Sequence, residues 1–509
     1  MQKKLRTLLA LHAIWGVILA LSISKYGLGA SSDALAYMFS GTNWIKGNGL
    51  IEYTGNPYIL WPPLYPMLIG FLHAVGLSAF VSTHVIQFIT FGLIAYTSSV
   101  FLLRIFPDDF AFALLGSFLL LTGPVVISTF YMIGTDYLFM LFPIALALLI
   151  QKYSEQQTWF ILTLMGLTAA LAMLTRYIGY ALVLSTVIAV FYYSTGSVFK
   201  RFFYASYSGV FSLSPFLWML KTWQVTSENF REPLTFIEYA SQYTLGILDW
   251  LNIFLENERE VSNFHFSMVW GPIILAVIVL FLLSRKIQVF TPMVTFSLGF
   301  GAIYTIALFS NALISYFNRL WGRFQLPIYF PLVILVLLVI QYGLKYLREN
   351  HPRFYSPLAV LGILFLLFIG TSQVNRSIII MQNARNGIIA ENHVNTQEMN
   401  ENSVIQYWRK NPPEGSFKLF SNYPEIIAFF TEQQTYASPR KSGVYDKTII
   451  PLESYTGNLF SSGQDVYLLW VEPHSYVHVY LPHELEPIAK IKIIFENEDG
   501  GLYLLHPIK

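Results

Sequence analysis

The sequence predicts a polytopic α-helical membrane protein with a C-terminal external α/β domain, and three observations predict it. First, 55% of the 509 residues are hydrophobic and only 12% are charged, whereas soluble domains carry about 25% charged residues. Second, the chain holds about eleven apolar runs of the length that crosses a bilayer. Third, the composition becomes polar after residue 372. We therefore expect a transmembrane domain at 1–372 and a soluble domain at 373–509.

The first element is an apolar run at 8–23 that follows basic residues at positions 3, 4 and 6. Such a run could be the core of a signal peptide that is cleaved near the small residues at 29–30. The run is about 16 residues long, which exceeds most signal-peptide cores, and many further apolar runs follow it. These two features favour an uncleaved first helix.

The later apolar runs predict the other membrane spans. The segment 63–80 is an exception, because it opens with Trp-Pro-Pro and contains His73 and two glycines. We expect this segment to form an interfacial or re-entrant helix that does not cross. The predicted spans are 7–24, 83–103, 110–130, 137–151, 158–175, 178–195, 202–220, 266–284, 288–310, 327–343 and 356–372.

Basic residues in the short connections predict the orientation of these helices. If 63–80 does not cross, the basic residues of these connections all fall on one side of the membrane. Cytoplasmic loops carry such an excess of lysine and arginine. The connections 25–82 and 221–265 and the tail then lie outside. We expect a multi-pass protein of the plasma (inner) membrane, with a cytoplasmic N-terminus and an external or periplasmic C-terminal domain. The basic residues are Lys3, Lys4, Arg6, Arg104, Lys152, Lys200, Arg201, Arg285, Lys286, Lys345 and Arg348.

The tail is typical of a small α/β domain. The segment 499–501, Asp-Gly-Gly, predicts a turn between two strands. The expected strands are 417–421, 466–471, 491–496 and 502–506, and the expected helices are 423–431 and 475–483.

Composition also excludes several classes of function. The net charge of +2 is too small and too dispersed for a nucleic-acid surface. The chain has no cysteine, which excludes disulfides and thiolate chemistry. His474, His478 and His483 have helical spacing but lack a companion carboxylate, so we interpret them as surface residues and predict no metal site. No cofactor is predicted, and a requirement for a divalent metal stays open.

Ionisable residues near the external ends of spans are the candidates for chemistry, because charge is costly at membrane depth. Asp33 could cap a helix or could act as a general base on an acceptor hydroxyl. Asp136 is a second candidate catalytic carboxylate, or it could pair with an arginine. Arg176, Arg319 and Arg323 could bind a phosphate, or could extend toward lipid headgroups.

The first external loop, 25–82, carries a family resemblance. Its pieces are Asp33 with Tyr37, then Gly-Asn-Gly-Leu at 47–50, then Trp-Pro-Pro-Leu-Tyr-Pro at 61–66. In this order they resemble the first loop of the membrane glycosyltransferase superfamily with the C-type fold, and most closely its branch of protein O-mannosyltransferases and the aminoarabinose transferase of lipid A. The resemblance implies that Asp33 is the catalytic carboxylate. It also implies a donor and acceptor loop that contains Tyr37, Trp61, Pro62, Pro63 and Tyr65.

Three later segments are similar to motifs of the same superfamily. Gly134–Phe139 resembles the acidic motif of the second external loop, Leu174–Tyr177 the arginine motif of the third, and Asn318–Phe324 the Arg-aromatic segment before a late span. One departure weakens any inference about the acceptor, because Ala34 follows Asp33 where several members place Glu after Asp.

The resemblance implies an inverting glycosyltransferase that moves a sugar from a polyprenyl phosphate to an acceptor hydroxyl on a protein, lipid or glycan. The expected partners are this donor, the acceptor and membrane lipids. Arginines at the interface suit the donor, because the leaving phosphate gains negative charge. Two alternatives stay open: a transporter or flippase of a lipid-linked saccharide, and a polymerase or ligase of surface polysaccharide.

Overall fold

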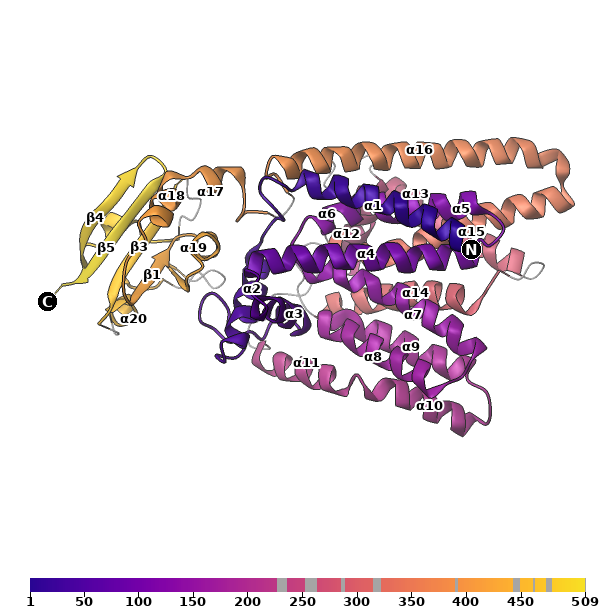
Figure 1. The fold of residues 1–509 in the computed structure, drawn as a ribbon, viewed down its shortest axis with the longest axis horizontal. Coiled ribbons are helices and arrows are strands. Elements are labelled where there is room, and N and C mark those ends of the chain that lie inside the picture. The colour runs from indigo at the N-terminus through magenta and orange to yellow at the C-terminus, as the bar shows by residue number, and fades with distance from the viewer. Residues whose placement is uncertain are drawn as a thin grey trace. The chain divides into compact units, whose positions relative to one another are not determined.

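The computed structural model describes residues 1–226, 236–251, 263–284, 289–314, 322–389, 392–442, 449–460, 463–472 and 478–508. The chain forms two compact units (Figure 1). Unit 1 consists of residues 1–22, 59–65 and 84–382, and unit 2 of residues 23–58, 66–83 and 383–509.

Unit 1 is a bundle of helices. Six helices of the described residues are long and apolar enough to cross a membrane, or seven if the bent pair α5 and α6 counts as one span. The chain is therefore a multi-pass helical membrane protein, as its sequence predicts. The helices are α1 (Gln2–Ser22), α4 (Ala79–Ile105), α5 (Phe110–Thr122), α6 (Pro124–Phe130), α7 (Thr135–Glu155), α8 (Trp159–Thr175), η1 (Tyr177–Gly179), α9 (Tyr180–Tyr193), α10 (Val198–Val210), α11 (Leu213–Thr226), α12 (Phe236–Leu251), α13 (Asn263–Ser284), α14 (Pro292–Ile314), α15 (Gly322–Asn350) and α16 (Pro352–Arg385).

Each predicted span corresponds to one of these helices or to a broken pair. The span 110–130 is divided between α5 and α6, which meet at an angle of 47°. The span 202–220 is divided between α10 and α11. The helix α16 continues to Arg385, beyond the domain boundary that we expected at residue 372. The count of about eleven spans stays a prediction.

The break between α5 and α6 is stabilised by polar side chains from later helices. Pro124 opens α6 and has no amide N–H to donate. The Tyr329 hydroxyl donates to the carbonyl of Leu119 at 2.7 Å, and Ser377 donates to the carbonyl of Thr122 at 2.6 Å. Gln373 donates to the Tyr329 oxygen at 3.0 Å. These bonds satisfy backbone carbonyls that would otherwise be costly in an apolar interior.

The predicted inner loops of unit 1 contact one another. Lys4, near the start of α1, donates to the carbonyl of Pro107 after α4 at 2.8 Å. The turn after α7 contacts the turn after α9, because Gln157 donates to the carbonyl of Tyr193 at 2.8 Å. Figure 1 shows the N-terminus and the turn after α9 toward the same end of the helices. The opposite ends of α7, α8 and α15 carry the candidate site.

Unit 2 combines part of the first loop, which the sequence predicts to be external, with the C-terminal tail. Its loop helices, α2 and α3, pack closely through Gly41 and Gly70. The helix α3 has 11 residues, about 16 Å at 1.5 Å per residue, and a membrane core is about 30 Å thick. This length supports a helix at 63–80 that does not cross. The helices are α2 (Ser32–Ile45), α3 (Leu64–Ala74), α17 (Gln397–Glu401), α18 (Ser403–Lys410), α19 (Pro424–Thr431), η3 (Leu452–Tyr455), α20 (Thr456–Phe460) and η4 (Pro482–Leu485).

The tail forms a five-stranded sheet with the order β2-β1-β3-β5-β4. The strand β1 pairs in parallel with β2 and β3, and β5 pairs in antiparallel fashion with β3 and β4. The predicted strands and the helix 423–431 are confirmed, whereas β2 was not predicted and most of 475–483 lies outside the described residues. The strands are β1 (Phe417–Ser421), β2 (Thr435–Ala437), β3 (Asp465–Val471), β4 (Ala489–Asn497) and β5 (Gly500–Pro507).

Candidate functional site

A buried ion pair joins the N-terminus of α7 to the C-terminus of α8. Asp136 lies in the first turn of α7, where the helix dipole favours a carboxylate. Arg176 is the C-cap residue that follows α8, and its Nη1 pairs with Oδ1 of Asp136. The Asp136 side chain is only 11% exposed, and the Arg176 side chain only 16%. The carboxylate therefore fixes the position of the guanidinium, because neither charge can be left alone in an apolar bundle.

A second arginine shares an aromatic ring with Arg176. Phe324 lies in the first turn of α15, and its ring centroid is 5.3 Å from Cζ of Arg176 and 5.1 Å from Cζ of Arg323. The Tyr304 hydroxyl of α14 donates to the carbonyl of Phe324 at 2.8 Å, which fixes the start of α15. The structure thus brings two of the three predicted arginines to one ring. Arg319 lies outside the described residues.

The Pro-Pro segment of the first loop belongs to the same unit as this ion pair. Tyr177, next to Arg176, donates to the carbonyl of Ile59 at 3.2 Å. Tyr65 is fully buried, and its hydroxyl lies against the backbone of Gly134, which begins the helix of Asp136. The segment 59–65 is therefore attached at both of its ends to the residues that flank the pair. Between these ends Trp61 is half-buried, and Pro62 and Pro63 are buried.

Asp33 lies in unit 2, in the first turn of α2. The N-cap position is occupied by Ser31, with a backbone φ of −118° and no side-chain capping bond. Asp33 is half-buried, and four residues later Tyr37 is 3% exposed and contacts the ring of Tyr58 edge to face at 6.3 Å. The carboxylate therefore does not occupy the capping position that one sequence interpretation gave it.

Glu52 is the second carboxylate of the first loop, and the sequence analysis did not identify it. It lies in a short β-hairpin at 50–58, in which its amide donates to the carbonyl of Asn56 at 2.8 Å. The hairpin packs on α2, because Asn43 donates to the carbonyl of Ile51 at 3.0 Å and the rings of Phe39 and Tyr53 meet at 6.2 Å.

Burial, and to a smaller extent the negative charge of Asp33, together raise the pKa of Glu52 to about 7. Both effects disfavour the charged carboxylate. Asp33 and Glu52 therefore influence each other electrostatically, although no short motif joins them in the sequence. The only signal was an acidic residue after an apolar pair and shortly before Gly55.

The tail histidines lie apart from these groups in the chain. His478 is exposed, and its Nδ1 shares a hydrogen bond with the hydroxyl of Ser442 at 3.1 Å. His483 is exposed in η4, and His474 lies outside the described residues. Across the described residues, the side chains form no group of three His, Cys, Asp or Glu that could bind a metal.

Comparisons with known proteins identify the fold. Neither a protein-family profile nor a curated protein sequence matches this chain. The crystal structure of ArnT from Cupriavidus metallidurans bound to undecaprenyl phosphate is similar over 97% of both chains, with a TM-score of 0.61 and 13% identity.

Two other solved structures are similar over nearly the whole chain. The archaeal oligosaccharyltransferase AglB from Archaeoglobus fulgidus, in complex with an inhibitory peptide and a dolichol-phosphate, has a TM-score of 0.54 and 12% identity over 98% of this chain and 74% of its own. The arabinofuranosyltransferase AftD from Mycobacteria has a TM-score of 0.51 and 11% identity over 99% of this chain and 40% of its own. These likenesses confirm the C-type glycosyltransferase fold that the sequence predicts.

Proposed function

We propose that this chain, which has the C-type glycosyltransferase fold, transfers a sugar from a polyprenyl-phosphate donor to an acceptor hydroxyl on the external face of the membrane. The acceptor belongs to a protein, a lipid or a glycan. Two of the similar structures contain undecaprenyl phosphate and dolichol-phosphate, which supports a polyprenyl phosphate as the donor carrier.

The observation that carries the proposal is the pair of guanidinium groups at the ring of Phe324. When a sugar leaves its phosphate, negative charge grows on the phosphate oxygens. Fixed positive groups in a poorly hydrated site stabilise such charge without reorganisation, and guanidinium groups suit phosphate through paired hydrogen bonds. We assign Arg176 and Arg323 to the donor phosphate, with Arg319 as a third candidate. Asp136 positions Arg176.

The proposed chemistry is a single displacement. The acceptor hydroxyl oxygen attacks the anomeric carbon and forms the new glycosidic bond. The bond from this carbon to the phosphate oxygen breaks, and its electron pair leaves with the polyprenyl phosphate. Asp33 accepts the hydroxyl proton as general base, and attack opposite the leaving group inverts the anomeric configuration. Tyr37, Trp61, Pro62, Pro63 and Tyr65 belong to the loop that receives donor and acceptor.

The test is turnover of radiolabelled polyprenyl-phosphate sugars by the purified full-length protein in lipid nanodiscs, with total membrane lipids and glycans as acceptors. We expect release of free polyprenyl phosphate in step with labelling of an acceptor. Arg176→Gln and Arg323→Gln should each lower this rate about 100-fold or more, as loss of one transition-state hydrogen-bond donor does. The matched control is Arg353→Gln, because Arg353 is an exposed arginine at the start of α16.

Two outcomes would overturn the proposal. One is movement of the labelled lipid across a sealed vesicle membrane without any sugar transfer, which would indicate a flippase. The other is equal turnover by the wild type and by both arginine variants.

A further inference from the structure

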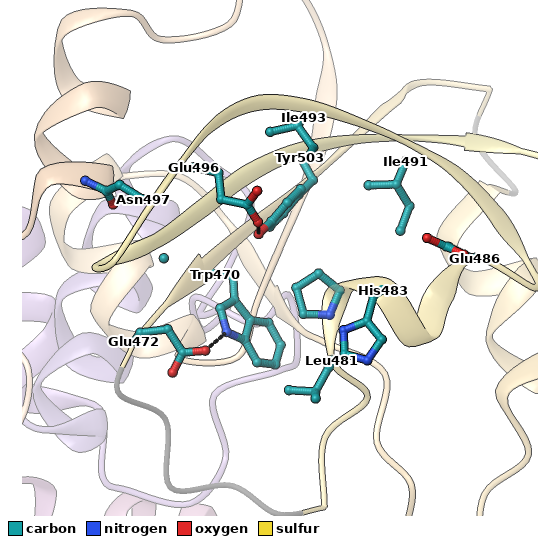
Figure 2. A pocket seen from close by; sticks show the side chains of 12 residues that line it. Trp470, Glu472, Leu481, His483, Glu486, Ile491, Ile493, Glu496, Asn497 and Tyr503 are labelled. Carbon is teal, nitrogen blue, oxygen red and sulfur yellow. Dashed lines mark hydrogen bonds between the residues drawn. The ribbon is translucent and has the colours of Figure 1, made fainter.

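The C-terminal sheet carries a cavity of about 490 Å³, within the range of small-molecule sites. One wall is the sheet, through residues of β3, β4 and β5. The opposite wall is formed by residues at and beside η4, which include Leu481 and His483 (Figure 2). The cavity lies wholly within the tail of unit 2 and is separate in the chain from the residues assigned to transfer.

A glycine creates the space at the sheet wall. Trp470 of β3, Gly501 of β5 and Glu496 of β4 form one row across three strands. Gly501 leaves room for the Tyr503 side chain, because a Cβ atom added at position 501 would lie 2.3 Å from the Tyr503 hydroxyl oxygen. The Tyr503 ring can therefore pack over Gly501 of β5, with its hydroxyl directed toward Glu496.

Two carboxylates of the cavity are oriented by aromatic donors. The indole Nε1 of Trp470 donates to Oε1 of Glu472 at 2.7 Å. The hydroxyl of Tyr503 donates to Oε1 of Glu496 at 2.5 Å. Figure 2 shows the Trp470 and Tyr503 side chains on the sheet wall, each beside its glutamate. Because each aromatic residue is at most 6% exposed, the carboxylates are fixed by rigid neighbours.

The lining combines these groups with a net negative charge. Glu486 adds a third carboxylate, and Asn497 adds an amide. The twelve lining residues that the structure describes include no lysine and no arginine, so the cavity disfavours anions. Apolar side chains, among them Ile491 and Leu481, supply the remaining surface.

We propose that this cavity binds a carbohydrate, either neutral or amino-substituted. Sugars present both hydroxyl donors, which carboxylate and amide oxygens accept, and C–H faces, which pack on aromatic and aliphatic side chains. An ammonium group on the sugar would be favoured by the three glutamates, and a carboxylate on the sugar would be repelled. This inference goes beyond the proposed transfer, because it rests on the cavity alone and uses no catalytic residue.

The test is saturation-transfer difference NMR with the full-length protein in nanodiscs, because common detergents carry sugar head groups. The probes are methyl β-glucoside, glucosamine and glucuronic acid at concentrations near 1 mM, where weak binding is detectable. We expect signals for the first two probes and at least fivefold weaker signals for glucuronic acid. The double variant Glu472→Gln with Glu496→Gln should lose at least four fifths of the signal, because an amide oxygen accepts sugar hydroxyls less strongly than a carboxylate. Both amide oxygens can still accept the bond from the aromatic donor, so the cavity wall should keep its shape.

The matched control is Glu498→Gln, an exposed glutamate next to the lining residue Asn497, and it should bind like the wild type. Thermal unfolding shows whether the double variant is folded, and Glu486→Gln provides a milder change at an exposed position of the lining. Sugar signals that persist in the double variant and in Glu486→Gln would overturn the proposal. Binding of spermidine but of none of the sugars would also overturn it, because the cavity would then be a site for organic cations.

Discussion

At the scale of single residues, Asp33→Asn separates a catalytic carboxylate from a structural one. Ser31 occupies the N-cap of α2 and Asp33 lies in its first turn, so the amide should weaken the dipole interaction, which is worth about 0.3–1 kcal/mol. An amide cannot accept the acceptor's proton, and loss of a general base lowers rates about 100-fold to 10,000-fold. We expect this loss in the rate of sugar transfer, with donor binding nearly unchanged.

Asp33→Glu and Asp136→Asn provide the comparison. The glutamate keeps a base and should retain partial activity. Asp136→Asn should be milder than Asp33→Asn, because Asp136 acts through Arg176. Transfer at the wild-type rate by purified Asp33→Asn protein would remove Asp33 from the catalytic site.

Glu52 should make the stability of the protein depend on pH. Its pKa rises from the ordinary 4.5 to about 7, first through burial and then through Asp33. A raised folded-state pKa contributes stability that is fully present below about pH 4.5 and is lost as the pH rises through about 7. Glu52→Gln removes this titration. The melting temperature of the variant should therefore increase relative to the wild type between pH 5 and pH 8.

The control for this prediction is Glu414→Gln, an exposed glutamate before β1, whose difference from the wild type should not change over the same range. Asp33→Asn should move the Glu52 transition to lower pH, because it removes the nearby negative charge. A melting difference for Glu52→Gln that is constant from pH 5 to pH 8 would contradict the argument.

Some residues of the candidate site could be predicted from the sequence, and others could not. Asp33, Asp136, Arg176 and Arg323 stand in motifs with recognisable spacing, and the costly placement of charge near membrane spans draws attention to them. Glu52 has no such signal, because its importance comes from a hairpin that folds onto α2. Whether these residues perform catalysis stays a prediction, which the variants above test.

At the scale of elements, the crossing of α2 and α3 depends on two glycines. A Cβ atom at Gly41 would lie 2.5 Å from the carbonyl oxygen of Pro66, and one at Gly70 would lie 2.5 Å from the carbonyl oxygen of Gly41. Backbone atoms cannot move aside as a flexible side chain can. Gly41→Ala should therefore lower the free energy of unfolding by about 1–3 kcal/mol, measured by thermal unfolding of the protein in nanodiscs.

Gly92→Ala is the matched control, because Gly92 is also a helical glycine and a Cβ atom there would meet nothing within 4 Å. Alanine should be neutral or should stabilise α4 by up to about 1 kcal/mol. Equal effects at the two positions would show that α2 and α3 tolerate a wider separation.

Apolar length and strand patterning predict most elements, and local geometry explains the exceptions. The run 110–130 is continuous in composition, yet Gly123 and Pro124 divide it because proline cannot continue the hydrogen bonding of α5. The strand β2 has only three residues, too few for an alternating pattern. Its position follows from parallel pairing with β1, which is a non-local contact.

At the scale of the whole molecule, the sequence predicts two parts but not which segments belong to each part. The first loop was assigned to the membrane domain, whereas residues 23–58 and 66–83 form one unit with the tail. Contacts distant in sequence produce this arrangement: the amide of Thr435 donates to the carbonyl of Tyr53 at 3.2 Å, and Phe80 contacts Phe429 edge to face at 5.2 Å. Composition along the chain carries no information about such pairs.

The orientation of the chain in the membrane is the last prediction. The short α3 and the shared position of the basic turns support a cytoplasmic N-terminus and an external tail. The chain has no cysteine, so a single introduced cysteine reports its own side of the membrane. Glu498→Cys should react with a membrane-impermeant maleimide in intact spheroplasts. Lys200→Cys, at the start of α10, should react only after the membrane is permeabilised.

Both positions are exposed in the structure, so accessibility to the reagent depends on the side of the membrane and not on burial. The cysteine-free wild type supplies the background, and labelling after permeabilisation shows that each variant is present. Labelling of Lys200→Cys but not of Glu498→Cys in intact spheroplasts would reverse the orientation. That result would place Asp136, Arg176 and Arg323 at the cytoplasmic ends of their helices, because Arg176 and Lys200 lie on opposite ends of the bundle in the proposed topology. The reversed orientation would favour a donor in the inner leaflet, and the proposal of transfer on the external face would fail. The assignment of the arginines to the donor phosphate would remain testable by the arginine variants.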